Sequence, residues 1–215
     1  NRMNWLAFDI GGAHLKVADG CGFSLEQPFA LWRQPAELHQ GIARMLALSP
    51  PCDAVAVTMT GELADCYPAR AEGVRQILQE VEQGSGDRLL RVYRTAGDFV
   101  SITDAVREPH AVAASNWHAM ARWAGRQFSR GSAVLIDIGS TTTDLIPLSE
   151  GQVHAAGKTD LARLQSGELV YTGVRRTPIA TLISELPYQG TLCGVARETF
   201  ATTLDVYLTL DQWPE

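Results

Sequence analysis

The sequence has little lysine and no long apolar stretch. Lys16 and Lys158 are the only lysines among 18 basic residues, and the formal net charge is −6 with a pI of about 5.4. Proteins that bind nucleic acid by neutralising phosphates carry a basic excess, so we expect no nucleic-acid partner. No apolar run approaches the roughly 18–20 residues that a membrane span needs, so we also expect no membrane partner.

Cysteines are few and scattered. Cys21, Cys52, Cys66 and Cys193 form no CxxC pair, which is typical of reduced thiols and predicts a cytoplasmic protein. Hydrophobic residues make up 46% and charged residues 20% of the 215 positions, which excludes a disordered chain and a coiled coil. The length suits one large domain or two small ones. Because the chain ends directly after a helical pattern, we expect it to be truncated or partly ordered.

Strand and helix patterns alternate along the chain, which predicts a mixed α/β class. We expect strands at 5–10, 14–19, 53–58, 89–93, 133–137, 144–148 and 168–171. We expect helices at 35–48, 70–83, 109–128, 160–164, 178–186 and 199–210. Helix 109–128 is rich in small residues, which is typical of close packing against a neighbour.

An internal repeat is the strongest feature of the sequence. Residues 8–18 read FDIGGAHLKVA and residues 136–146 read IDIGSTTTDLI. Each copy has an apolar strand, an Asp at its end, a glycine turn and a returning strand. Internal repeats determine architecture, and two copies predict two similar lobes that face each other across a cleft. We place the lobes at 1–129 and 130–215, with the second lobe incomplete.

The repeated segments carry groups suited to a phosphate. Glycines let the backbone approach a bulky anion, and the N–H groups of such a turn can bind its oxygens. We therefore expect phosphate contacts from both turns and from one lysine: Gly11, Gly12, Lys16, Gly139, Ser140, Thr141 and Thr142. The carboxylates of Asp9 and Asp137 would repel a bare phosphate, so they predict an intervening Mg²⁺, which prefers oxygen ligands.

These two segments resemble the phosphate-binding hairpins of the actin/Hsp70/sugar-kinase superfamily, and the second is close to hydantoinase/oxoprolinase-like members. A narrower resemblance covers nearly the whole chain. It depends on residues 58–65 (TMTGELAD), 114–118 (ASNWH), 168–178 (ELVYTGVRRTP) and 198–207 (ETFATTLDVY). This combination is similar to the methanofuran-biosynthesis synthase family, found beside tetrahydromethanopterin-linked one-carbon genes.

The resemblance implies a two-lobed, ribonuclease H-like fold and a transferase. In that family the phenol of γ-glutamyltyramine, or here a tyrosine-like acceptor, attacks the CH₂ carbon of a furanmethanamine diphosphate, and diphosphate leaves. The partners implied are small-molecule substrates, and a homo-oligomer is compatible with the family. The hairpins would then hold diphosphate, with Mg²⁺ and Lys16 stabilising the charge on the leaving oxygen.

The phenol has a pKa of about 10, so a positioned base should help the attack. Four side chains are candidates for this base: Glu62, Asp65, His118 and Asp144. Each has an alternative, since Glu62 suits the start of a helix and His118 suits a packed core. Asn116 is a further catalytic candidate, which could orient substrate or cap a turn.

Residues 171–176 supply candidate substrate contacts. Arg175 and Arg176 can bind a phosphate or carboxylate in bidentate fashion, or form a solvated basic turn. Tyr171 can stack on an aromatic ring or fill an interface.

Two rival functions stay open: an ATP-dependent kinase or hydantoinase-like enzyme, and a non-catalytic nucleotide sensor or scaffold. ATP is disfavoured because no Gly-Gly adenosine motif follows Asp144.

Overall fold

The computed structural model describes residues 3–213 and consists of two compact units. Unit 1 extends to Trp123, and unit 2 begins at Ala124. All four cysteines are free. Among residues 3–213, none of the helices combines the length and apolar character that a bilayer crossing requires.

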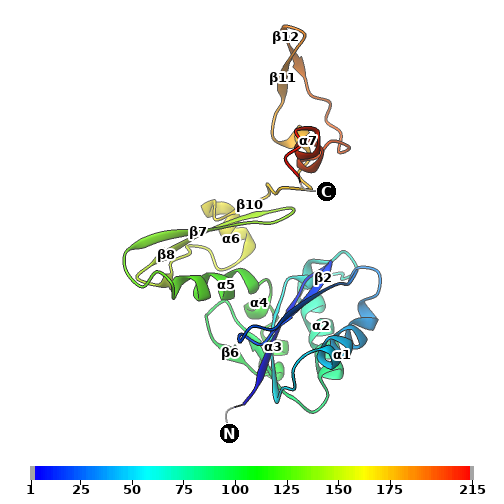
Figure 1. Cartoon of the computed structure of the whole chain (residues 1–215), viewed down its shortest axis with the longest axis vertical. Helices are drawn as coiled ribbons and strands as arrows, with labels where there is room; N and C mark the ends of the chain where they lie inside the picture. Colours follow the sequence, from blue (N-terminus) through cyan, green and yellow to red (C-terminus); the bar gives the residue numbers. More distant parts are fainter. Residues whose placement is uncertain (1–2, 214–215) are drawn as a thin grey trace. The chain divides into compact units, whose positions relative to one another are not determined.

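Unit 1 is built on a six-stranded sheet (Figure 1), and the strand order is β3-β2-β1-β4-β5-β6. The strands are β1 (Trp5–Ile10), β2 (His14–Ala18), β3 (Ser24–Pro28), β4 (Ala54–Met59), β5 (Leu89–Tyr93) and β6 (Phe99–Val100). The first three strands are antiparallel, and β1, β4 and β5 are parallel. The sheet is therefore mixed, with an antiparallel meander of β1 to β3 joined to parallel strands.

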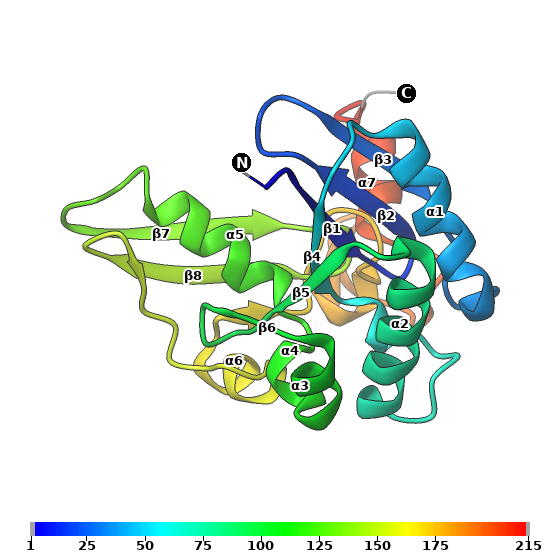
Figure 2. The same ribbon diagram turned by 90° about the horizontal axis from the view of Figure 1, so that it is seen from below.

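Two amphipathic helices pack on this sheet, each through one apolar stripe. The helical segments are η1 (Pro35–Glu37), α1 (Leu38–Leu48), η2 (Gly61–Leu63), α2 (Arg70–Ser85), α3 (Ile102–Arg107), α4 (Pro109–Val112) and α5 (Asn116–Gly125), and the last two residues of α5 belong to unit 2. Figure 2 shows α1 and α2 side by side. Leu38, Ile42 and Met45 of α1, and Ile77 of α2, join Phe8 in one buried apolar cluster. The core of unit 1 therefore lies between the sheet and these two helices.

The expected helix 109–128 is wrong as one element. It is two helices, α4 and α5, separated by Ala113–Ser115, and Ala114 has a left-handed φ of 45°. The Ala114 N–H donates to the Glu62 carboxylate at 2.8 Å instead of to a helical carbonyl. A tertiary contact thus ends a helix that the local sequence would continue.

Unit 2 contains a four-stranded antiparallel sheet with the path β10-β8-β7, and β9 pairs with β8. Its strands are β7 (Ser132–Ile138), β8 (Thr143–Ser149), β9 (Gln152–Val153) and β10 (Leu169–Val170). Its helical segments are α6 (Asp160–Ser166), η3 (Ile179–Thr181) and α7 (Thr203–Thr209). Thr159 caps α6 by accepting from the Ala162 N–H, and Gly167 ends it with a φ of 74°.

The expected helix 178–186 is also wrong. Only η3 is helical there, and Glu185–Tyr188 is a strand, β11, which pairs with β12 (Thr191–Gly194). The residue before a proline avoids the helical region, so Pro187 keeps Leu186 extended.

The mixed α/β prediction is confirmed, whereas the cleft between two lobes and the boundary at 129/130 stay predictions.

Candidate functional site

A row of polar side chains crosses the sheet of unit 1. Strand register pairs Asp9 with Lys16 on one side and with Thr58 on the other, and pairing of Val57 with Val92 puts Tyr93 beside Thr58. Residues in register project to the same face of a sheet. The alternate residues, Phe8 among them, belong to the buried core on the other face. The sheet thus aligns Lys16, Asp9, Thr58 and Tyr93 in one line.

Asp9 is the acidic centre of this row. Thr58 Oγ1 donates to Asp9 Oδ1 at 3.3 Å, and Asn116 also hydrogen-bonds to the Asp9 side chain. Burial raises the pKa of Asp9, while Lys16 and the two hydrogen bonds act in the opposite direction. Burial outweighs these neighbours, so Asp9 is a partly desolvated carboxyl with hydrogen-bonding groups and a cation beside it.

The start of α5 brings two of the predicted residues to this row. Asn116 reaches Asp9, and its Oδ1 also accepts from the Trp117 N–H at 2.7 Å. His118 Nδ1 lies 2.9 Å from the Tyr93 hydroxyl, and the Trp117 ring packs edge-on against the imidazole. The structure thus groups four predicted residues, Asp9, Lys16, Asn116 and His118, in unit 1.

Sequence reasoning missed Thr58 and Tyr93. Both end expected strands, at the same edge as Asp9, and parallel strands present their carboxyl ends at one edge. Their position at the carboxyl ends of expected strands, as for Asp9, was the sequence signal that could have identified Thr58 and Tyr93.

The two glycine turns have the same closing bond. The Gly11 N–H donates to the His14 carbonyl at 3.0 Å, and the Gly139 N–H donates to the Thr142 carbonyl at 2.8 Å. The repeat seen in the sequence is therefore a repeat of local structure. In the first turn Gly12 has open space around it. Lys16 Nζ lies 4.0 Å from Glu26 Oε1, and both side chains are about half exposed.

Glu62 and Asp65 have very different surroundings. Glu62 is only 2% exposed, and its Oε1 accepts from Ala114 and lies 3.5 Å from Arg70 Nε. Asp65 is exposed. A base must reach the proton it removes. The contacts of Glu62 include the Ala114 backbone and Arg70.

In unit 2 a second group forms around the turn at 139–142. The N–H groups of Arg175 and Arg176 donate to the Ser140 carbonyl at 3.1 and 2.8 Å, and the Val174 N–H donates to the Gly139 carbonyl. Gly173 lies against the backbone of Ser140, since a Cβ there would lie 2.5 Å from the Ser140 carbonyl carbon. The predicted phosphate-binding turn and the predicted substrate-binding segment are therefore adjacent along their backbones in this unit.

The side chains near this turn differ in exposure. Tyr171 is 59% exposed, and the Arg175 guanidinium lies 5.6 Å from the Trp213 ring centre. Ser140 and Thr141 have hydroxyls 3.5 Å apart. The contacts of Arg175 and Arg176 with this turn are made by their backbone N–H groups.

Asp137 and Asp144 face each other in the hairpin register of β7 and β8. Asp144 Oδ1 lies 2.8 Å from Nη1 of Arg163, which is 1% exposed. Burial raises the pKa of Asp144, Arg163 opposes that shift, and Asp137 adds to it. Asp144 is therefore committed to an ion pair, and Asp137 is the more exposed of the two.

Within residues 3–213, no three His, Cys, Asp or Glu side chains gather as a metal site. Mg²⁺ usually takes one or two protein carboxylates together with substrate phosphates and water. Asp9 fits that pattern because its donors are hard oxygens and Thr58 lies beside it. Asp137 supplies one such carboxylate in unit 2.

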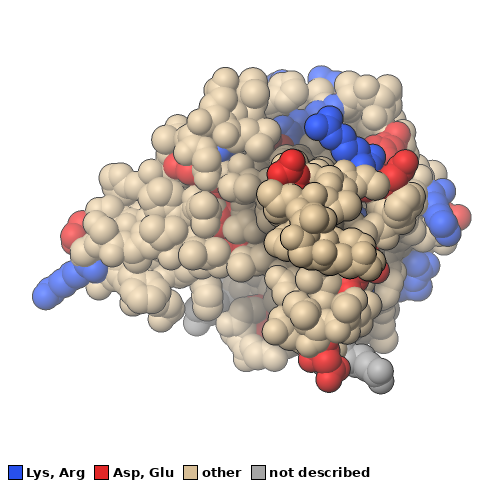
Figure 3. All heavy atoms as spheres, turned by 90° about the horizontal axis from the view of Figure 1, so that it is seen from above, with Lys and Arg blue, Asp and Glu red and all other residues tan. Residues whose placement is uncertain are grey.

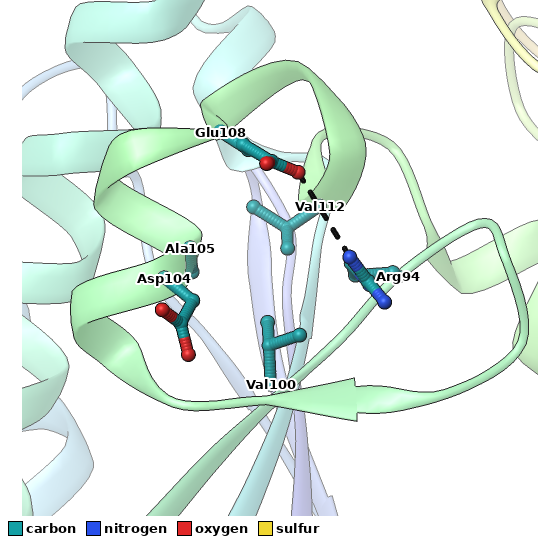
Figure 4. A pocket seen from close by; sticks show the side chains of 6 residues that line it. All are labelled: Arg94, Val100, Asp104, Ala105, Glu108 and Val112. Carbon is teal, nitrogen blue, oxygen red and sulfur yellow. Dashed lines mark ion pairs between the residues drawn. The ribbon is translucent and has the colours of Figure 1, made fainter.

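A pocket lies in unit 1 beyond the end of β5. It has a volume of about 280 Å³ and is lined by Arg94, Val100, Asp104, Ala105, Glu108 and Val112 (Figure 4). Arg94 and Glu108 point toward each other across it, with Nη1 and Oε2 3.9 Å apart. Ligand pockets usually exceed about 300 Å³. None of the residues singled out in the sequence lines it.

Charge is dispersed over the surface that Figure 3 shows. On that face acidic and basic atoms form small separate groups among atoms of neither kind. That face therefore carries no large patch of one charge.

Comparison with known proteins adds two kinds of relative. The family profile described as hydantoinase/oxoprolinase matches residues 53–215. The (4-{4-[2-(gamma-L-glutamylamino)ethyl]phenoxymethyl}furan-2-yl)methanamine synthase of Methanocaldococcus jannaschii is 37% identical over 213 residues, which are 98% of this chain and 63% of the relative. The synthase of the same name from Methanococcus vannielii is 44% identical over 84 residues, 39% of this chain and 37% of the relative. The chain thus spans less than two thirds of the curated relatives it matches.

Solved structures give weaker similarity. A Ppx/GppA phosphatase of Aquifex aeolicus has a TM-score of 0.41 at 10% identity, over 80% of this chain and 53% of that one. An exopolyphosphatase-like protein has a TM-score of 0.39 at 12% identity, over 81% of this chain and 51% of that one. Scores of this size support no inference about function.

Proposed function

The chain belongs to the hydantoinase/oxoprolinase family, and on this basis we propose that it catalyses an ether-forming transfer in methanofuran biosynthesis. A phenol, from γ-glutamyltyramine or a tyrosine-like acceptor, would be joined to a furanmethanamine diphosphate. The observation that carries the proposal is the 37% identity to a named synthase over 98% of this chain. That span includes the polar row, both glycine turns and residues 171–176.

The reaction exchanges one C–O bond for another. The phenol oxygen forms a bond to the furan CH₂ carbon, the bond from that carbon to the diphosphate oxygen breaks, and diphosphate leaves with the electron pair. The phenol proton passes to a base. Because a phenol has a pKa of about 10, proton removal and stabilisation of the leaving group are the two tasks of the site.

We assign the base to His118. Among the four candidates, it is half-buried in unit 1 beside the polar row, and Tyr93 orients its ring. Glu62 is instead bonded to Ala114, and Asp144 is paired with Arg163. If the Nδ1–H donates to the Tyr93 oxygen, the Nε2 atom is the proton acceptor.

Anionic groups of the substrates would be bound by positive and hydrogen-bonding groups. Lys16 and the N–H groups of the 11–14 turn are suited to diphosphate, whose charge grows as the bond breaks. Asp9, with Thr58 beside it, would hold Mg²⁺, which when bound would neutralise phosphate charge. In unit 2, Ser140, Thr141, Thr142, Arg175 and Arg176 would bind a phosphate or the glutamyl carboxylate.

Turnover tests the proposal directly. The chain is incubated with Mg²⁺, furanmethanamine diphosphate and γ-glutamyltyramine or tyrosine, and mass spectrometry follows the ether and diphosphate. We expect product without ATP, and a decrease of about 10²-fold or more for His118→Asn, since a general base contributes that much. Asp87→Asn, which changes an exposed carboxylate, is the control. Consumption of ATP in place of ether formation would reject the transferase in favour of a kinase-like enzyme.

A further inference from the structure

Glu62 makes a buried contact that the proposed chemistry does not use. Its carboxylate is 2% exposed and accepts from the Ala114 N–H at 2.8 Å. Arg70 Nε, at the first residue of α2, lies 3.5 Å from the same oxygen. A charged acceptor roughly doubles the strength of a hydrogen bond, and a nearby cation offsets part of the cost of burying a carboxylate.

The residue that Glu62 holds is conformationally unusual. Ala114 has a φ of 45°, a left-handed conformation that an L-residue with a Cβ adopts only at a cost. Its neighbours Ala113 and Ser115 are buried, so the bend is enclosed. Such a conformation persists only where the surroundings over-determine it.

The bend decides where α5 begins. Asn116 is the first residue of α5, two positions after Ala114, and it reaches Asp9. His118 follows within the same turn and contacts Tyr93. A change at Ala114 would therefore move both side chains relative to the polar row.

From this geometry we infer that Glu62 is a positioning residue and that Arg70 assists it. The pair holds Ala114 left-handed, and so aims Asn116 at Asp9 and His118 at the acceptor. The kinetic part of this inference rests on the proposed function, whereas the structural part does not.

Two substitutions of Glu62 separate positioning from proton transfer. Gln keeps an oxygen acceptor for the Ala114 N–H but cannot take up a proton at neutral pH. We expect Glu62→Gln to retain turnover within about threefold, and Glu62→Ala to lose about 10–100-fold, the loss typical of removing a supporting hydrogen bond in a site. A base would give the opposite pattern, with both variants equally inactive.

A second-site change gives the sharper test. Glycine adopts positive φ without the Cβ penalty. We therefore expect Ala114→Gly to restore most of the turnover of Glu62→Ala, mainly in kcat. The inference is overturned if the double variant, Glu62→Ala with Ala114→Gly, recovers no turnover and Glu62→Gln is as inactive as Glu62→Ala. Glu72→Gln on the exposed face of α2 is the matched control.

Hydrogen exchange gives a readout independent of turnover. The Ala114 N–H should exchange slowly in the unchanged chain and in Glu62→Gln, and at least about tenfold faster in Glu62→Ala. Arg70→Gln should give an intermediate rate and serves if Glu62→Ala does not fold. If the Ala114 N–H exchanges at an unchanged rate in Glu62→Ala, the positioning role is overturned. If Glu62→Ala does not fold, an unchanged rate in Arg70→Gln overturns it. If exchange responds but no ether forms, the proposed function fails and the positioning role stands.

Discussion

Single carboxylates in this protein differ in what they do, although their sequence contexts look alike. Glu168 is an example, since it is buried at 7% exposure and binds no substrate in our proposal. Its oxygens accept from the N–H groups of Ala156 and Gly157 and from Ser166 Oγ, at 2.6 to 3.0 Å. Burial by itself would raise the pKa of Glu168, but these hydrogen bonds outweigh it and hold the pKa below 4.5. Glu168 thus anchors the loop before α6.

This environment predicts a pH dependence of stability. A carboxyl whose pKa is lower in the folded state adds stability that is present above its unfolded pKa, here about 4.5. That stability is lost as the pH falls through the folded value. We expect Glu168→Gln to cost about 2 kcal/mol at pH 7 and to flatten the loss of stability below pH 4.5. Urea unfolding from pH 7 to pH 3 measures both. The exposed Glu198→Gln should leave the profile unchanged, and an equally steep acid loss in Glu168→Gln would contradict the assignment.

Elements of the chain are joined by close backbone contacts that glycine permits. Gly173 lies against the turn at 139–142, and its own carbonyl accepts at 2.8 Å from the Oγ1 of Thr203, the first residue of α7. The 172–177 segment thus links the second glycine turn to the last helix. This segment stabilises the turn through hydrogen bonds from its N–H groups to the carbonyls of Gly139 and Ser140.

Gly173→Ala tests that support. The added Cβ would lie 2.5 Å from Thr141 N and the Ser140 carbonyl carbon, so backbone must move. We expect lower thermal stability of unit 2 and at least about tenfold weaker diphosphate binding. The NMR chemical shifts of residues 139–142 during a diphosphate titration measure that binding. Gly194→Ala is the matched control, because a Cβ there has no neighbour within 4 Å. Equal behaviour of the two variants would contradict this role for Gly173.

At the scale of the whole molecule, each unit has buried apolar residues of its own. The buried cluster that contains Phe8, Met45 and Ile77 lies entirely in unit 1. The buried apolar residues of the sheet in unit 2 are Ile146 and Leu148 of β8 and Leu169 of β10. The two units can therefore differ in stability.

Reciprocal cavity substitutions test this independence. Ile77→Ala and Ile146→Ala each remove a fully buried side chain, and such changes cost about 2–5 kcal/mol. We expect Ile77→Ala to accelerate hydrogen exchange in β1, β4, α1 and α2 and to leave β7 and β8 unchanged. Ile146→Ala should do the reverse. Accelerated exchange in both units from either variant would mean that they unfold as one.

Much of the fold follows from local patterns. Strands β1, β2, β4, β5, β7 and β8 and helix α2 lie where apolar periodicity and turn residues predict them. The two hairpins are predictable because an Asp, a glycine turn and a returning strand are contiguous in sequence. The break at Ala114 and the hairpin of β11 and β12 were not predicted, because their stabilising partners lie elsewhere or compete with helix propensity.

The amino-acid sequence alone determined the mixed α/β class and the repeated glycine turns. It also identified Asp9, Lys16, Asn116 and His118 as candidate site residues. The tertiary structure decided which of them meet. Strand register aligned Thr58 and Tyr93 with Asp9, and the buried Glu62 set the start of α5. The reason is physical: register and the partner of a buried carboxylate depend on groups dozens of residues apart, and only the packed chain brings these together.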